Sequence, residues 1–164
     1  MSLQIHERTQ ARVFAREVYF LGSVALSKGQ GVCYDRDVGT ATEADGKRDK
    51  DVQLPDNTNN NSFAGVVVRA YSAVTGGQWI KIYEPGSVCQ VLLDDAAATI
   101  GENSIVTCMA DSANTGEWTT DSGYRGRGSA QVLQTVTAAG LLLVKLDDGL
   151  DSGLVELVPT ATLT

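Results

Sequence analysis

Hydrophobic and polar side chains alternate along short segments of this chain, with the period of two that is typical of half-buried β-strands. The segment QWIKIYE, residues 78–84, shows this most clearly. Ile80 and Ile82 fall on one face of an extended chain, whereas Trp79 and Tyr83 fall on the other. We therefore expect the isoleucine face to lie in a hydrophobic core.

The same alternation continues over most of the chain. Residues 18–35 fit a strand, a turn at Gly29 and Gly31, and a second strand, and the Pro-Gly pair at 85–86 predicts a β-hairpin. Runs rich in β-branched and aromatic residues, separated by Gly-, Asp- or Pro-bearing turns, are predicted strands at 63–72, 78–84, 87–93, 104–110, 129–136 and 141–146. Strands at this spacing, without helical periods, predict an all-β fold, either a compact antiparallel barrel or a sandwich.

Three segments lie outside this pattern and define the expected organisation. We interpret residues 1–17 as an N-terminal arm, residues 18–149 as the body, and residues 150–164 as a C-terminal tail. Within the body, residues 36–62 are almost wholly polar and contain an Asn run, so we interpret them as a long surface loop. The total length of 164 residues suits one such body with an arm and a tail.

The two ends carry the candidate contact residues. Arg8, Arg12 and Arg16 recur every four residues, as on one face of a helix, but no apolar stripe lies opposite them. An arm that orders on contact with a partner is our interpretation, and a simple frayed terminus is the alternative. In the tail, the apolar residues have no obvious place in a closed barrel and need a partner to cover them: Leu154, Leu157 and Val158.

The distribution of charge along the chain limits which classes of partner it can bind. The chain has a net charge of −7, yet residues 1–30 hold four basic side chains against two acidic ones, so the remainder is strongly acidic. An acidic body argues against direct binding of nucleic acid, and the basic start suits an acidic protein surface. No apolar run reaches the length of a membrane span and the first residues lack a signal-peptide pattern, so we expect no membrane association.

Few residues offer reactive chemistry. His6 is the single histidine and lies in the expected arm, whereas nucleophilic catalysis needs an imidazole fixed beside its partner. Cys33, Cys89 and Cys108 are widely spaced in strand-like runs, which predicts buried reduced thiols rather than a metal site or disulfides. We expect no enzyme activity, no cofactor and no metal.

Two loops resemble binding motifs only in part. Residues 147–153 bunch three aspartates but lack the alternating ligands of a calcium loop, so a solvated turn is favoured. The segment GYRGRGSA, residues 123–130, lacks the spacing of a phosphate-binding loop. We interpret it as a flexible turn whose Arg125 and Arg127 are available for contacts with a partner.

The ordered segments ALSKGQGVCYD, SFAGVVV, IYEPGSVCQVLL, ATIGENSIVTC and GRGSAQVLQT together resemble the decoration proteins, also called cement or head-stabilisation proteins, of tailed bacteriophages. The likeness covers roughly residues 18–149 and is a pattern of turns and strands. It implies a compact β-barrel or β-tulip, often a homotrimer, on the outer surface of an assembled virion. The implied partner is the major capsid protein, whose neighbouring subunits it bridges after synthesis in the host cytoplasm.

Three other classes remain open at this point. A non-catalytic carbohydrate-binding β-sandwich would expose several aromatic side chains on one face, and Trp79 and Tyr83 fit that expectation, with a host-surface glycan as the ligand. Another phage structural protein, of the tail or a head fibre, would share the β-rich pattern. A small hydrolase would need a pocket of convergent polar groups, which the lone His6 makes unfavourable.

Overall fold

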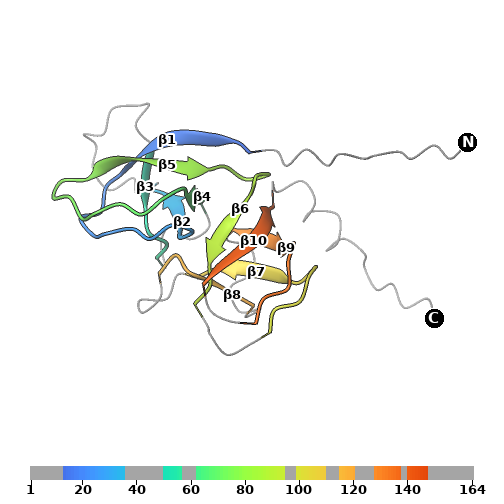
Figure 1. Cartoon of the computed structure of the whole chain (residues 1–164). Helices are drawn as coiled ribbons and strands as arrows, with labels where there is room; N and C mark the ends of the chain where they lie inside the picture. Colours follow the sequence, from blue (N-terminus) through green and yellow to red (C-terminus); the bar gives the residue numbers. More distant parts are fainter. Residues whose placement is uncertain are drawn as a thin grey trace, which may run out of the picture.

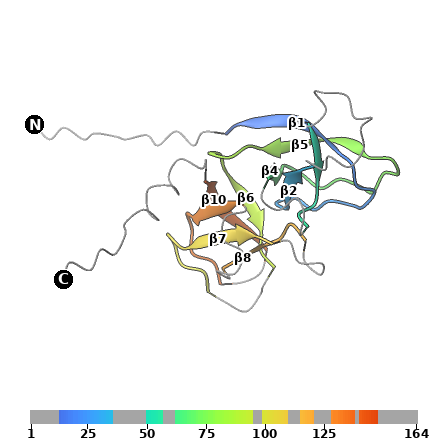
Figure 2. The ribbon, with the colours of Figure 1, turned by 180° about the vertical axis from the view of Figure 1, so that it is seen from behind.

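The computed structural model describes residues 13–35, 50–56, 62–94, 99–109, 115–120, 128–137 and 140–147, and Figure 1 shows their arrangement. Every regular element in these ranges is a β-strand, and the strands form a closed barrel and a second, five-stranded sheet. The predicted all-β fold with a compact barrel is confirmed. Figure 2 shows from behind that the barrel and the sheet lie side by side.

The barrel contains the first five strands in the order β1-β3-β2-β4-β5. Their bounds are Ala15–Phe20 for β1, Gly31–Tyr34 for β2, Asp51–Gln53 for β3, Phe63–Val67 for β4 and Gln78–Tyr83 for β5. β5 pairs with β1 along the whole length of both strands, from Ala15 opposite Tyr83 to Phe20 opposite Gln78. This pairing closes the barrel and leaves it no free edge.

The second sheet has the order β6-β10-β9-β7-β8, with antiparallel neighbours throughout. Its bounds are Val88–Leu92 for β6, Ile105–Cys108 for β7, Trp118–Thr119 for β8, Ser129–Val132 for β9 and Leu141–Leu146 for β10. A parallel bridge between Leu93 and Trp118 connects the ends of the two edge strands. The sheet therefore curls back on itself around its own core.

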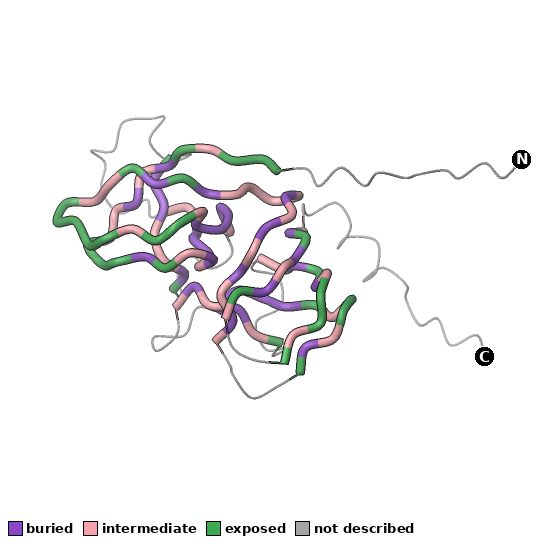
Figure 3. Tube along the Cα trace, viewed as in Figure 1, coloured by how far each residue is buried: buried purple, intermediate pink, exposed green. Residues whose placement is uncertain are grey.

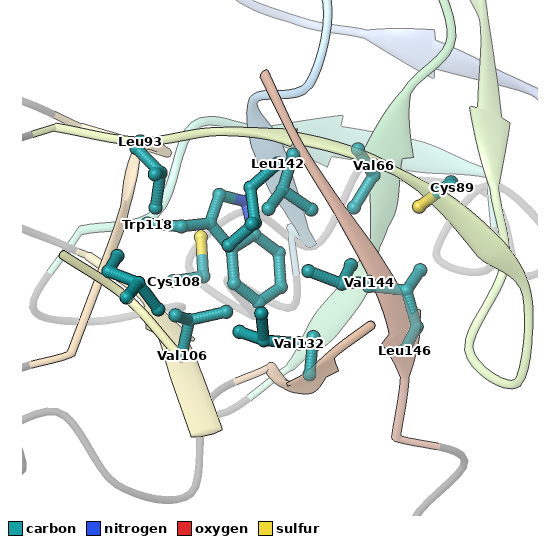
Figure 4. Close-up of a cluster of buried hydrophobic side chains, with 13 residues drawn as sticks. Val66, Cys89, Leu93, Val106, Cys108, Trp118, Val132, Leu142, Val144 and Leu146 are labelled. Atoms are coloured by element: carbon teal, nitrogen blue, oxygen red, sulfur yellow. The ribbon is translucent and has the colours of Figure 1, made fainter. Parts of the chain in front are cut away.

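Each sheet encloses a hydrophobic core, as the buried segments in Figure 3 show. The barrel core is formed by buried side chains of Val18, Phe20, Leu26, Val32, Val52, Ala64, Val67, Ile80 and Ile82. In the second core the indole of Trp118 is fully buried among aliphatic side chains of β6, β7, β9 and β10 (Figure 4). The predicted core face of residues 78–84 is confirmed, because Ile80 and Ile82 are buried.

Strand β4 contributes to both cores. Val32 of β2 pairs with Gly65, and the next residue, Cys33, pairs with Phe63, so Ala64 is the extra residue of a β-bulge. The bulge interrupts the alternation of β4: Ala64 lies in the barrel core, and Val66 lies in the sheet core. A single strand thereby packs the two sheets against each other.

The predicted hairpin at Pro85–Gly86 is wrong. β5 belongs to the barrel and β6 to the second sheet, where it pairs with β10, so the turn joins two sheets. A Pro-Gly turn between alternating segments does not specify which strands pair, because the main-chain edges of each segment can pair with more distant strands, as β5 does with β1 and β6 with β10. Strands β1 and β2 also do not pair directly, since β3 lies between them.

The predicted polar loop 36–62 contains a strand, which corrects that prediction in part. Residues Asp51–Gln53 form β3, which pairs parallel to β1 and antiparallel to β2, and Val52 is fully buried in the barrel core. Three residues that directly follow a run of charged side chains are too few to show a period of two. β1 also begins at Ala15, three residues before the expected start of the body at residue 18.

Candidate interaction surfaces

The residue before β1 and the end of β10 are attached to the body at one place, the connection between β5 and β6. The main chain of Phe14, which precedes β1, is bound there twice by Ser87: the Phe14 N–H donates to Ser87 Oγ at 2.9 Å, and that hydroxyl donates to the Phe14 carbonyl at 3.0 Å. The Glu84 N–H donates to the same carbonyl at 2.9 Å. Ser87 is fully buried, so this attachment is shielded from water.

The end of β10 is attached to the same connection. The Gly86 N–H donates to the Leu146 carbonyl at 3.1 Å, and the Leu146 N–H donates to the Ser87 carbonyl at 2.8 Å. We call Val13, Phe14, residues 84–87 and Leu146 the terminal junction. In Figure 1 the start of β1 and the end of β10 lie beside this connection.

The terminal junction exposes apolar side chains. Val13 is 55% exposed and Phe14 is 45% exposed, although the main chain of Phe14 is held firmly. A fixed backbone that presents an aromatic side chain to solvent suits contact with a partner, because little conformational entropy is lost when that partner binds.

Arg16 lies in β1 at this end of the barrel. Its Nε is 3.1 Å from Oε1 of Glu84, an ion pair, and its guanidinium lies over the ring of Tyr34 at 5.1 Å from the centroid. The expected helical face of arginines does not reach Arg16, because this residue is in a strand. The structure gives Arg16 a role inside the body, where it fastens β1 to the end of β5.

A second surface lies on the outside of the β1–β5 ribbon, toward its other end. Trp79 is 58% exposed and meets the ring of Tyr19 edge-on, with centroids 5.4 Å apart and an angle of 74°. The Tyr19 hydroxyl donates to the carbonyl of Gly76 at 2.7 Å. This hydrogen bond fixes Tyr19, and Tyr19 in turn supports the exposed indole.

A shallow hollow of about 300 Å³ lies beside Trp79. It is lined by Glu17, Val68, Arg69, Tyr71, Trp79, Ile80 and Lys81, and we call these residues, together with Tyr19, the aromatic patch. Tyr71 is oriented by the Lys81 N–H, which donates to its hydroxyl at 2.8 Å, and the guanidinium of Arg69 lies 5.1 Å from the centroid of its ring. In the hollow, the cations of Arg69 and Lys81 and the carboxylate of Glu17 thus lie around the rings of Tyr71 and Trp79.

Tyr83 does not share this patch with Trp79, although both were expected on one exposed face. Tyr83 is half-buried and packs against the core of the second sheet. The second sheet covers that end of β5, and no pattern within the strand itself could reveal this. Tyr19 and Tyr71 take the place expected for Tyr83, and neither is distinguishable in sequence from an ordinary strand tyrosine.

The three cysteines are buried and none of them forms a disulfide, as predicted from their strand-like surroundings. Burial raises the pKa of Cys89 to about 12. Burial also raises the pKa of Cys108 well above its ordinary value, and the neighbouring Cys33 adds to the effect. Thiols held in the protonated form are poor nucleophiles and poor metal ligands.

Asp94 and Glu117 form a pair of carboxyl groups between the second sheet's edge strands. Burial raises the pKa of Glu117, and the charge of Asp94 and a hydrogen bond to Asp94 raise this pKa further.

Within the described ranges, no three His, Cys, Asp or Glu residues gather as potential metal ligands. Among the same residues, no helix is long and apolar enough to span a membrane.

The other predicted contact residues lie outside the part of the chain that the structure describes. These are Arg8, Arg12, Arg125, Arg127, Leu154, Leu157 and Val158. His6, which was not expected to be catalytic, also lies outside the described residues. The terminal junction itself was not predicted. Its key residue, Ser87, is a single serine after a turn, and only the pairing of distant strands reveals its role.

The described residues define an all-β module with two candidate interaction surfaces, one at each end of the β1–β5 ribbon. No family model and no curated protein matches the chain. Among solved structures, the fold is similar to that of a chain from the capsid of Myoviridae phage XM1, with a TM-score of 0.53 and 22% sequence identity. The match covers 84% of this chain and 83% of that one, so the two chains share a fold over most of their length.

Proposed function

We propose that this chain is a structural protein of a phage virion, which binds the outer surface of the assembled capsid and stabilises it by bridging major capsid protein subunits. The observation that carries the proposal is the fold shared with a chain of a phage capsid over 84% of this chain. The role is structural rather than catalytic, and buried, protonated thiols agree with that role.

The terminal junction is the surface that we propose faces the shell. It presents Val13 and Phe14 to solvent, and in sequence the segment 1–12 directly precedes Val13 and the segment 148–164 follows shortly after Leu146. One segment carries Arg8 and Arg12, and the other carries apolar residues. Segments that leave a rigid body at one point can contact two neighbouring capsid subunits at once, and several weak contacts together give strong binding.

A homotrimer is the assembly that we propose, because three copies around a three-fold position would present three terminal junctions to the shell. Closed rotational symmetry is the usual arrangement of identical subunits. Binding to the closed shell and not to the opened one stabilises the closed form by mass action, by about 2.7 kcal/mol per site at a concentration of 100 times Kd.

The test uses capsids of the parent phage prepared without this protein. The purified full chain is added, and its binding is measured by co-sedimentation, together with the temperature at which the capsids open. We expect saturable binding and a higher opening temperature. Absence of binding, or binding that leaves the opening temperature unchanged, would overturn the proposed stabilising role.

A further inference from the structure

We propose that the aromatic patch is a carbohydrate-binding site, which takes a hexose unit of a glycan against the indole of Trp79. Trp79 is 58% exposed, yet it is held in position, because Tyr19 supports its ring and is itself fixed by a hydrogen bond to Gly76. An aromatic ring that remains exposed although its position is fixed offers a preorganised binding surface.

The chemistry around the indole is that of a sugar site. The C–H groups of a pyranose form an apolar face with a slight positive charge, which suits the negative face of an aromatic ring. At the rim, Glu17 supplies hydrogen-bond acceptors, and Arg69 and Lys81 supply donors. A polyhydroxylated ligand uses both kinds of group, whereas a phosphate, which accepts hydrogen bonds, would use only the donors of Arg69 and Lys81.

The size of the hollow also favours a small ligand unit. Its volume of about 300 Å³ lies at the lower end of the range for small-molecule sites. A protein partner would need a contact of about 800 Å² on each side, which the hollow alone does not provide. The half-buried Tyr71 and the buried Ile80 are among its lining residues, and Tyr71 is held by its hydrogen bond from the Lys81 N–H.

The patch and the terminal junction lie at opposite ends of β1. Tyr19 pairs with Trp79 near the end of the strand, whereas Ala15 pairs with Tyr83 beside the junction. If the junction faces the shell, the patch points away from it and can reach a glycan on a host surface. This orientation rests on the proposed function, whereas sugar binding by the isolated chain does not.

The test uses the ¹⁵N-labelled full chain and its two indole N–H signals. Trp79 is exposed and Trp118 is fully buried. The Trp79 signal therefore reports ligand binding at the surface, and the Trp118 signal reports a change in the core. Methyl α-D-glucopyranoside, methyl α-D-mannopyranoside and methyl β-D-galactopyranoside are titrated to about 50 mM, well above a Kd of ~1 mM. We expect at least one sugar to shift the Trp79 signal saturably while the Trp118 signal stays in place.

Two variants make the result specific. Trp79→Ala should weaken binding of that sugar at least about tenfold, followed through the Lys81 amide signal. Ile105→Ala is the matched control, because Ile105 is 57% exposed on the second sheet, and this variant should bind as the parent does. A saturable shift with none of the three sugars, or equal affinity in Trp79→Ala, would overturn the inference.

Capsid binding by Trp79→Ala separates the two proposals. We expect this variant to bind capsids as tightly as the parent. Loss of capsid binding would assign the patch to the contact with the shell and would overturn its outward orientation, whereas the sugar titration decides the carbohydrate site itself. If the sugars bind but the full chain binds no capsid, the carbohydrate site stands and the proposed virion role fails.

Discussion

Single residues with several partners hold the two ends of the body together. Ser87 is the clearest example, because its side chain and main chain bind both Phe14 and Leu146. Its hydroxyl is fully buried, so no water can replace it without a rearrangement. The position of the terminal segments therefore depends on one small polar side chain.

The variant Ser87→Ala tests this dependence. Removal of the hydroxyl leaves the Phe14 N–H without its acceptor, and we expect the free energy of unfolding to fall by about 1–2 kcal/mol. Hydrogen exchange at Phe14 and Ala15 should accelerate more than exchange in β10. Ser23→Ala is the control, because Ser23 is exposed. Equal stability of both variants in urea unfolding would show that the hydroxyl does not hold β1.

Glu117 gives stability a dependence on pH. Its pKa is raised in the folded protein, first by burial and then by Asp94. Between the ordinary pKa and the raised pKa the folded state binds more protons than the unfolded state, so stability falls as pH rises through this window. The destabilising effect is complete above the raised pKa and absent below the ordinary one.

We therefore expect Glu117→Gln to raise the melting temperature at neutral pH. The gain over the parent should shrink as pH is lowered and vanish below the ordinary pKa of glutamate, about 4.3. Glu102→Gln serves as the control, since Glu102 is an exposed turn residue. A gain that is the same at every pH would contradict the assignment to ionisation of Glu117.

At the scale of elements, contacts between main chains join the barrel to the second sheet. Gly29 is at the centre of one such contact: its N–H donates to the Val67 carbonyl of β4, and its carbonyl accepts from the Leu92 N–H of β6, both at 3.0 Å. It has a φ of +89°, and a Cβ there would lie 2.6 Å from the nitrogen of Leu92. Only glycine allows so close an approach.

Gly29→Ala and Gly76→Ala form a matched pair. Gly76 has a similar φ of +86°, but a Cβ there would meet no atom within 4 Å. Both variants bear the cost of a left-handed backbone, about 1–3 kcal/mol, and only Gly29→Ala also forces the barrel and the sheet apart. We expect Gly29→Ala to lower the unfolding free energy clearly more than Gly76→Ala. An equal loss of unfolding free energy in the two variants would show that the barrel and the sheet accommodate the added methyl group of Gly29→Ala without further destabilisation.

The elements also show how far the sequence predicts the fold. Alternation placed Ile80 and Ile82 in the core and located most of the strands, because period and burial are local properties of a half-buried strand. Strand pairing is not local. The apparent hairpin at Pro85–Gly86 and the hidden strand Asp51–Gln53 both depend on partners distant in sequence.

The same reason limits prediction of the candidate sites. Trp79 was predicted to be exposed from its own strand, and it is. The surroundings that make it a candidate binding site come from β1 and from the segment after β4. The terminal junction likewise joins residues 73 positions apart, Phe14 and Ser87, and no local pattern predicts such a contact.

At the scale of the whole molecule, the common exit of the two ends leads to a prediction about truncation. Removal of residues 1–12 keeps Phe14 and β1, and removal of residues 153–164 keeps β10, so both variants should fold as the parent does. Each should bind capsids more weakly, because each loses one set of the proposed contacts with the shell. Co-sedimentation measures the binding, and melting curves check the fold. Full binding by both variants would contradict a role for the ends.

The most direct test of the central claim is a cryo-electron microscopy map of the parent capsid with this protein bound. We predict added density on the outer surface at positions between capsid subunits, into which the barrel and the second sheet fit with the terminal junction against the shell. The aromatic patch should face outward. A capsid without added density, or a body that contacts the shell through Trp79 while the terminal junction points to solvent, would contradict the account.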